Sequence, residues 1–140
     1  MKVHAMRAYP EECCGVLFGQ EAGELRRVCD VLEVGNQRTE NRERRYLITP
    51  EEYRSAERRA HEESMEIIGF YHSHPDQPAS PSQFDLEQAL PWWLYLIISV
   101  ESGQPAEVSS WTLRDDRSRF DEETVEVEDG QFVHRCKESS

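Results

Sequence analysis

Two apolar segments constrain the fold of this chain more than any other feature. The sequences are EIIGFY at Glu66–Tyr71 and WWLYLIISV at Trp92–Val100, and the second is the most apolar stretch in the chain. Each is short, and turn-forming or charged residues lie on either side, as expected of a buried strand. A chain with two such strands must cover them with other elements, so it needs a layered fold with a central sheet.

The remaining segments supply those elements. Residues 1–9 predict the end of a helix, and Gly15–Gly19 and Glu24–Val34 predict a hairpin with its turn at Gln20–Gly23. Further elements are expected in four segments: a helix opened by Thr49-Pro50-Glu51-Glu52, a helix over Ser82–Leu90, a strand over Glu107–Leu113 and a possible edge strand over Glu122–Glu128. The order α-β-β-α-β-α-β-β-β predicts an α/β fold, an α-β-α sandwich around a mixed, largely antiparallel sheet.

The length and charge narrow the classes of function. A chain of 140 residues fits one domain, expected over residues 1–128, with 129–140 as a flexible C-terminal tail. The formal net charge is -12, which argues against nucleic acid as a partner because phosphate binding needs a basic surface. No apolar run is long enough to span a membrane and no signal peptide is visible, so we expect a soluble cytoplasmic protein. The acidic surface also suits a high-salt cytoplasm, which we hold as a hypothesis.

The segment that carries chemistry follows the first buried strand. Residues i and i+2 of a strand share one face, so His72 and His74 can present two imidazole nitrogens to one point. Asp85 is placed to add a carboxylate from the first turn of the next helix. Two neutral histidines and one carboxylate leave a fourth position of Zn²⁺ open to water, which is typical of catalytic zinc sites. Zn²⁺ is therefore the expected cofactor.

Two plainer interpretations stay open on the residues alone. Paired histidines arise by chance on protein surfaces, and Ser82-Gln-Phe-Asp85 is by itself an ordinary capping box. Capping and metal binding also compete, because Asp85 is not expected to do both fully. A Cys–His nucleophile site has no identifiable orienting Asn or Asp, and the four cysteines suggest reduced thiols.

The spacing of these residues resembles a known family. His72-x-His74, seven residues, Ser82, two residues and Asp85 look like the H-x-H-x7-S-x-x-D signature of the JAMM (MPN+) metalloproteases. Upstream, Pro10-Glu-Glu12-Cys-Cys14-Gly15 resembles the P-x-E-x-C-G form of bacterial members. That register selects Glu12, with Glu11 as the alternative one step away.

The resemblance implies a fold, a site and a reaction. The fold would be MPN/cytidine-deaminase-like, with His72, His74 and Asp85 as zinc ligands. Glu12 would move a proton from the water to the leaving amine, and Ser82 would donate its hydroxyl to the oxyanion. The alternative is a non-catalytic zinc-binding MPN scaffold for protein assembly.

The short spacing after Asp85 suggests the substrate class. Only six residues separate Asp85 from Trp92, which leaves no room for the insertions with which eukaryotic deubiquitinating relatives grip ubiquitin. The chain resembles the compact prokaryotic branch, which cleaves after the C-terminal Gly-Gly of ubiquitin-like or sulfur-carrier proteins. The expected partner is therefore such a C-terminal tail, and the oligomeric state stays open.

Aromatic and histidine side chains outside the motif are expected to be ordinary structural residues. The tryptophans Trp92, Trp93 and Trp111 are predicted to be core or half-buried sheet residues rather than a substrate platform. The remaining histidines have no partner pattern and are expected to be solvated; they are His4, His61 and His134.

Overall fold

A computed structural model describes residues 1–22, 25–34, 50–128 and 131–135. The described helices are α1 (Lys2–Ala8), α2 (Pro50–Glu62) and α3 (Gln83–Gln88). The described strands are β1 (Cys14–Ala22), β2 (Leu25–Val34), β3 (Glu66–Pro75), β4 (Leu94–Glu101), β5 (Gln104–Leu113), β6 (Phe120–Glu128) and β7 (Gln131–Arg135).

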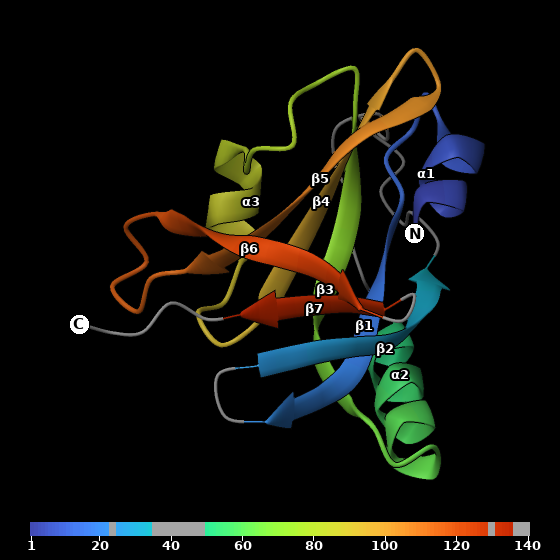
Figure 1. Ribbon diagram of the computed structural model, residues 1–140, viewed down its shortest axis with the longest axis vertical. Coiled ribbons are helices and arrows are strands. Elements are labelled where there is room, and N and C mark those ends of the chain that lie inside the picture. The colour runs from blue at the N-terminus through green and yellow to red at the C-terminus, as the bar shows by residue number, and fades with distance from the viewer. Residues whose placement is uncertain (23–24, 35–49, 129–130, 136–140) are drawn as a thin grey trace.

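The strands form one mixed sheet whose ends meet. Their order is β1-β2-β7-β6-β5-β4-β3, and β3 pairs with β1 to close a barrel. Among the described strands only β3 and β4 run parallel, and every other pair is antiparallel. Figure 1 shows β6 and β7 lying across the molecule between β5 and β2. The expected α/β class with a mixed, largely antiparallel sheet is confirmed.

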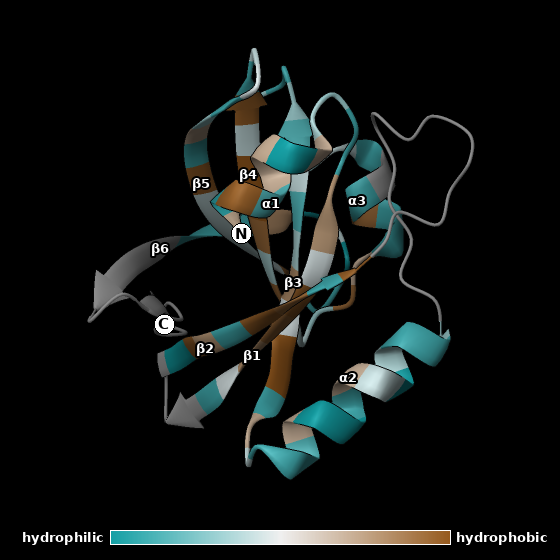
Figure 2. Cartoon of the chain, turned by 90° about the vertical axis from the view of Figure 1, so that its right-hand side faces the viewer, coloured by the Kyte–Doolittle hydropathy of each residue, from teal (hydrophilic) through white to brown (hydrophobic). Residues whose placement is uncertain are grey.

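Helices cover the sheet on both faces, so the sandwich layers are present as well. Ala5 of α1 packs into a cluster with Leu17, Leu96 and Ile98. The other face of β1 is covered by α2, whose small residues pack against the aliphatic and aromatic side chains of a second cluster. Figure 2 shows the apolar residues concentrated in the central strands, while α2 presents polar residues outward. Side chains that alternate along β1 therefore pack into two separate hydrophobic clusters, one on each face of the strand.

The parallel pair at the centre depends on a glycine. Gly69 lies opposite Leu94 in the ladder between β3 and β4. A Cβ at Gly69 would lie 1.9 Å from the backbone carbonyl oxygen of Leu94, which no side chain can accommodate without moving the strands apart. Gly69 thus fixes how closely the strand that carries His72 and His74 approaches β4.

The structure differs from the sequence expectations in the C-terminal part. Residues 131–135, expected to be flexible tail, form β7, which pairs with β2 and β6. As a consequence β6 has strand neighbours on both sides and is not an edge strand. One physical reason is that Phe132 and Val133 are residue types that favour extended backbone. The other is that a strand between β2 and β6 pairs with the backbone groups of both of these strands.

The other element boundaries shift modestly. Helix α2 begins at Pro50 as predicted, whereas the N-cap Thr49 and the loop predicted over Gly35–Arg45 lie outside the described residues. Strand β3 runs four residues beyond the predicted Tyr71, to Pro75, so His72 and His74 are inside the strand rather than after it. In the part of the chain that the structure describes, no helix is long and apolar enough to cross a membrane.

Candidate metal centre

The two histidines are positioned by the central strand. His72 pairs with Cys14 of β1 on one side and with Ile97 of β4 on the other, and its side chain is 1% exposed. His74, two residues on, shares that face and is 3% exposed. The intervening Ser73 points the other way. Strand pairing on both sides therefore fixes the direction in which the imidazoles point.

Ser73 also ties the histidines to the segment that carries the predicted glutamate. The Ser73 amide donates to the Cys13 carbonyl oxygen at 3.0 Å, and the Cys13 amide donates to Ser73 Oγ at 2.8 Å. This double contact holds the start of β1 beside the two histidines. Glu12, directly before Cys13, is buried at 5% exposure, whereas Glu11 is exposed. The burial favours Glu12 over Glu11 as the site residue.

Asp85 enters the site from α3, and the capping box is present in full. The Ser82 amide donates to Asp85 Oδ2 at 2.8 Å, and the Asp85 amide donates to Ser82 Oγ at 3.1 Å. The same carboxylate faces the histidines, with Oδ1 3.2 Å from His72 Nε2 and Oδ2 3.2 Å from His74 Nε2. The cap and the approach to the two histidines coexist because a carboxylate has several lone pairs.

These three side chains form a compact donor set. One ligand atom from each lies within 4.8 Å of the others, and the two Nε2 atoms are 3.1 Å apart. All three side chains are buried. Two imidazole nitrogens and a carboxylate converging on one point match the donors that Zn²⁺ prefers, so the residues fit the metal that the sequence predicts.

The protonation states suit metal binding. Burial lowers the pKa of His72, although the charge of Asp85 opposes this effect, so the imidazole is neutral near pH 7. Burial by itself would raise the pKa of Asp85, but the positive charge that His72 carries when protonated at low pH, together with the hydrogen bonds from His72 and the Ser82 amide, holds this pKa well below its ordinary value. A neutral imidazole and an ionised carboxylate are the forms that bind a metal.

The neighbouring cysteines are not nucleophiles. Burial raises the pKa of Cys14 to about 12, and it raises that of Cys13 as well. Neither side chain is a thiolate near neutral pH, which removes the activated form that a Cys–His mechanism needs. Cys13, Cys14 and Cys29, the cysteines within the described residues, are free thiols.

Sequence reasoning missed two contacts, one at the site and one on the opposite face of β3. His74 Nδ1 lies 2.9 Å from the Pro78 carbonyl oxygen, a backbone acceptor that no side-chain motif reveals. His4, expected to be solvated, is half-buried, and its Nδ1 lies 2.8 Å from the Tyr71 hydroxyl. The Pro-rich composition of residues 75–81 was the one available signal, since it indicates an ordered loop directly after His74.

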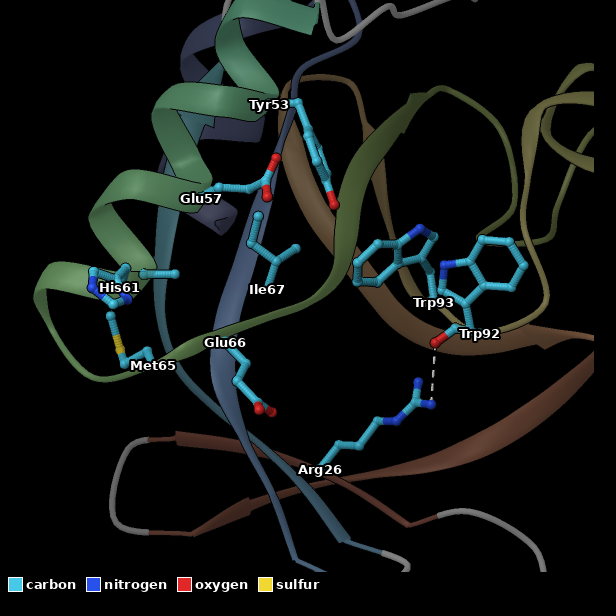
Figure 3. Close-up of a pocket in the computed structure, with 10 residues that line it drawn as sticks. Arg26, Tyr53, Glu57, His61, Met65, Glu66, Ile67, Trp92 and Trp93 are labelled. Atoms are coloured by element: carbon cyan, nitrogen blue, oxygen red, sulfur yellow. Dashed lines mark hydrogen bonds between the residues drawn. The ribbon is translucent and has the colours of Figure 1, made fainter.

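A hollow lies at the end of β3 opposite the metal centre. It is an open groove of about 570 Å³ between α2 and the connection that follows α3. Figure 3 shows Tyr53 and Glu57 on one wall, Trp92 and Trp93 on the other, and Ile67 between them. Trp92 is 60% exposed, so the prediction that it is a core or half-buried residue is wrong for this tryptophan, whereas Trp93 and Trp111 are half-buried.

The fold and the buried donor set together define the class: an α/β domain with a candidate metal centre on its central strand. A model described as prokaryotic homologs of the JAB domain matches residues 1–114, and the chain belongs to this family. The expected membership of the JAMM/MPN+ family is confirmed.

Individual relatives agree with this assignment. The Desampylase of Pyrococcus furiosus is 33% identical over 117 residues, which cover 84% of this chain and 76% of that protein. The Desampylase of Haloferax volcanii is 36% identical over 104 residues, which cover 74% of this chain and 71% of that protein. A solution structure of a protein from Salinibacter ruber matches with a TM-score of 0.70 and 44% identity, covering 88% of this chain and 82% of that one.

Proposed function

We propose that this chain is a zinc-dependent isopeptidase that hydrolyses the amide bond after the C-terminal Gly-Gly of a ubiquitin-like or sulfur-carrier protein. The observation that carries the proposal is the buried convergence of His72, His74 and Asp85 with the Glu12 segment fixed beside them. Two relatives named Desampylase support the substrate class, because that name describes removal of a ubiquitin-like modifier.

The chain's own residues would share the work as follows. His72, His74 and Asp85 hold the ion. When bound, Zn²⁺ polarises the scissile carbonyl and lowers the pKa of water to about 7. Glu12 accepts a proton from the attacking water and delivers it to the leaving amine. Ser82 Oγ accepts a hydrogen bond from the Asp85 amide. Its own hydroxyl proton is therefore available to donate to the developing oxyanion.

The burial of Glu12 suits this role. A carboxylate that is 5% exposed is shielded from bulk water, so its charge interacts more strongly with a nearby proton donor than it would in solvent. Glu11, one residue earlier, carries the same carboxylate, but its side chain is exposed to solvent. The pair therefore provides a matched comparison for experiment.

A glycine-rich tail could bind as an added strand. Within the described strands, β2 pairs with β7 only over Leu25–Val28, so its segment 29–34 has one strand neighbour. β5 pairs with β6 only over Ser110–Leu113, so residues 104–109 of β5 also have one strand neighbour, β4. Such open edges offer backbone hydrogen bonds to an extended peptide, and glycines fit where larger side chains would clash.

The test begins with the metal. Elemental analysis after dialysis should give about one zinc per wild-type chain and none for a folded His74→Ala variant, because a single vacant donor weakens the site severely. The second measurement is cleavage of a Gly-Gly-tailed carrier fused to an amine leaving group. Glu12→Gln should lower kcat by about 10²–10⁴-fold with zinc retained, while Glu11→Gln leaves kcat unchanged.

Each outcome decides between the alternatives. Zinc retention with no cleavage of any Gly-Gly-tailed protein would favour the non-catalytic scaffold. No zinc in folded wild type, even after the metal is added back, would overturn the proposal. Equal losses of kcat in the Glu11→Gln and Glu12→Gln variants would leave the hydrolase but remove Glu12 from its assigned role.

A further inference from the structure

The loop that follows β3 is held by hydrogen bonds from two neighbouring strands. Asp76 donates its amide to the Val100 carbonyl oxygen at 2.6 Å, and Ser99 Oγ donates to the Gln77 carbonyl oxygen at 2.7 Å. Ser99 is 1% exposed, so this hydroxyl has no access to bulk water as an alternative partner. The first half of the loop is thereby fixed from β4.

The second half of the loop is fixed from β5. Glu107, Ser109 and Trp111 alternate along this strand and therefore share one face. Ser109 Oγ donates to the Ala79 carbonyl oxygen, and it accepts from Trp111 Nε1 at 2.6 Å. Trp111 Nε1 also lies 3.3 Å from that carbonyl oxygen, and the Ala79 amide donates to Glu107 Oε1 at 3.2 Å.

Between these two held carbonyls lies Pro78, the residue that contacts His74. A carbonyl oxygen only accepts, so the 2.9 Å contact requires the proton on His74 Nδ1. With that proton on Nδ1, Nε2 is the ring nitrogen left to bind a metal, and it lies 3.1 Å from His72 Nε2 and 3.2 Å from Asp85 Oδ2. The position of the Pro78 carbonyl thus selects the tautomer that can bind a metal.

We propose that Ser109 and Trp111 are positioning residues for the metal ligand His74, acting through the Pro78 carbonyl. The Trp111 N–H and the Ser109 O–H form a short relay that ends on the Ala79 carbonyl and fixes the peptide next to Pro78. The assignment rests on the metal site of the proposed function. It extends that site to a strand, β5, that contributes no ligand.

The relay also explains why these two side chains are polar in a partly buried position. Ser109 is 8% exposed and Trp111 is half-buried, so each polar atom needs a partner inside the protein. Outer hydrogen bonds of this kind orient histidine ligands in metal sites, and their loss typically weakens metal binding by about 10–100-fold. The relay would act on His74 indirectly, because it contacts the loop and not the imidazole, and the Pro78 carbonyl makes the contact with His74.

The experiment compares four variants in metal-free and zinc-loaded protein. Ser109→Ala removes the relay, Trp111→Phe removes the N–H together with the five-membered ring of the indole, and Ser109→Thr keeps the hydroxyl. Thr112→Val is the matched control, because Thr112 lies on the same strand but its hydroxyl donates to Glu123, away from the loop. Zinc affinity is measured by chelator competition, and the His74 tautomer by long-range ¹H–¹⁵N correlation in metal-free protein.

The expected result is specific to the relay. Ser109→Ala and Trp111→Phe should each lose about 10–100-fold in zinc affinity and show a mixture of His74 tautomers, while Ser109→Thr recovers most of the affinity. Thr112→Val should keep both the affinity and the single tautomer. Thermal unfolding of the metal-free proteins shows whether the four variants remain folded, and Trp111→Phe carries the test should Ser109→Ala not fold.

Two results would overturn the inference. One is zinc affinity within about twofold of wild type in folded Ser109→Ala and Trp111→Phe, well short of the loss expected of an orienting contact. The other is an equal loss in Thr112→Val, which would indicate general destabilisation. A protein that binds no zinc but shows a single His74 tautomer, lost in Ser109→Ala, would contradict the proposed function and leave the relay intact.

Discussion

Asp85 shows how much one side chain can determine in this protein. Its backbone amide and one carboxylate oxygen close the capping box of α3, while both carboxylate oxygens face the two histidines. The cap orients the carboxylate before any metal binds, because the Ser82 amide restrains Oδ2. The residue pattern S-x-x-D therefore caps α3 and also places the Asp85 carboxylate against the two histidines.

His4 provides a prediction at the same scale. Burial lowers the pKa of His4 below its ordinary value of 6.5, with Glu33 opposing the effect. The folded state therefore binds this proton less readily than the unfolded state. His4 contributes stability above about pH 6.5, and this contribution is lost as the pH falls toward the lowered pKa.

The measurement uses the variant His4→Gln. The difference in unfolding free energy between wild type and His4→Gln should shrink as the pH falls from about 7.5 to about 5. Because His72 also has a lowered pKa, only this difference isolates His4. A difference that stays constant with pH would show that the contact with Tyr71 is indifferent to the charge of His4.

The connection from α3 to β4 illustrates the element scale. This short connection links α3, the helix that carries Asp85, to the buried strand β4, and it contains the two tryptophans Trp92 and Trp93. Trp93 turns inward, 5.4 Å from Phe70 and 6.5 Å from Tyr53 between ring centroids. The Trp92 side chain is exposed, and its backbone carbonyl oxygen accepts a hydrogen bond from Arg26. Adjacent residues of one type therefore have opposite roles.

A pair of substitutions tests this difference. Trp93→Ala should lower the unfolding free energy by about 2–4 kcal/mol, because it removes an aromatic side chain from a packed cluster. Trp92→Ala should change it by less than about 0.5 kcal/mol, since the side chain is mostly solvated. Chemical denaturation of both variants provides the measurement, and similar losses would show that Trp92 is packed in solution.

The whole molecule is dominated by its charge and by closure of its sheet. A formal charge of -12 on 140 residues implies mutual repulsion between surface carboxylates in the folded state. The sheet, in contrast, is closed, because β1 and β3, at the two ends of the strand order, pair with each other. Long-range charge opposes this compact arrangement, while strand pairing and burial stabilise it.

Salt should therefore stabilise the protein. Raising KCl from about 0.02 M to about 1 M shortens the Debye length from tens of ångströms to about 3 Å and screens this repulsion. We expect the unfolding midpoint to rise by roughly 3–5 °C, which corresponds to about 1 kcal/mol. The variant Glu62→Gln/Glu101→Gln/Asp115→Asn, altered at three exposed acids, should rise less. Stability that does not respond to KCl would contradict the high-salt hypothesis.

Much of this protein follows from local sequence patterns. The apolar runs at Glu66–Tyr71 and Trp92–Val100 define buried strands, and Pro50 and Ser82 define helix starts. The spacing of His72 and His74 gives their common face, because the period of a strand is fixed by backbone geometry. These features depend on residues that are neighbours in sequence, so the sequence by itself determines them.

Other features were decided only by tertiary structure. Glu12 is buried while Glu11 is exposed, and the adjacent Cys13 is hydrogen-bonded to Ser73, sixty residues away in the chain. The exposure of Trp92, the acceptor at Pro78 and the pairing of residues 131–135 likewise depend on distant segments. Burial and strand pairing depend on contacts between segments that are distant in sequence. Propensity and spacing depend only on neighbouring residues, so local patterns do not predict those contacts.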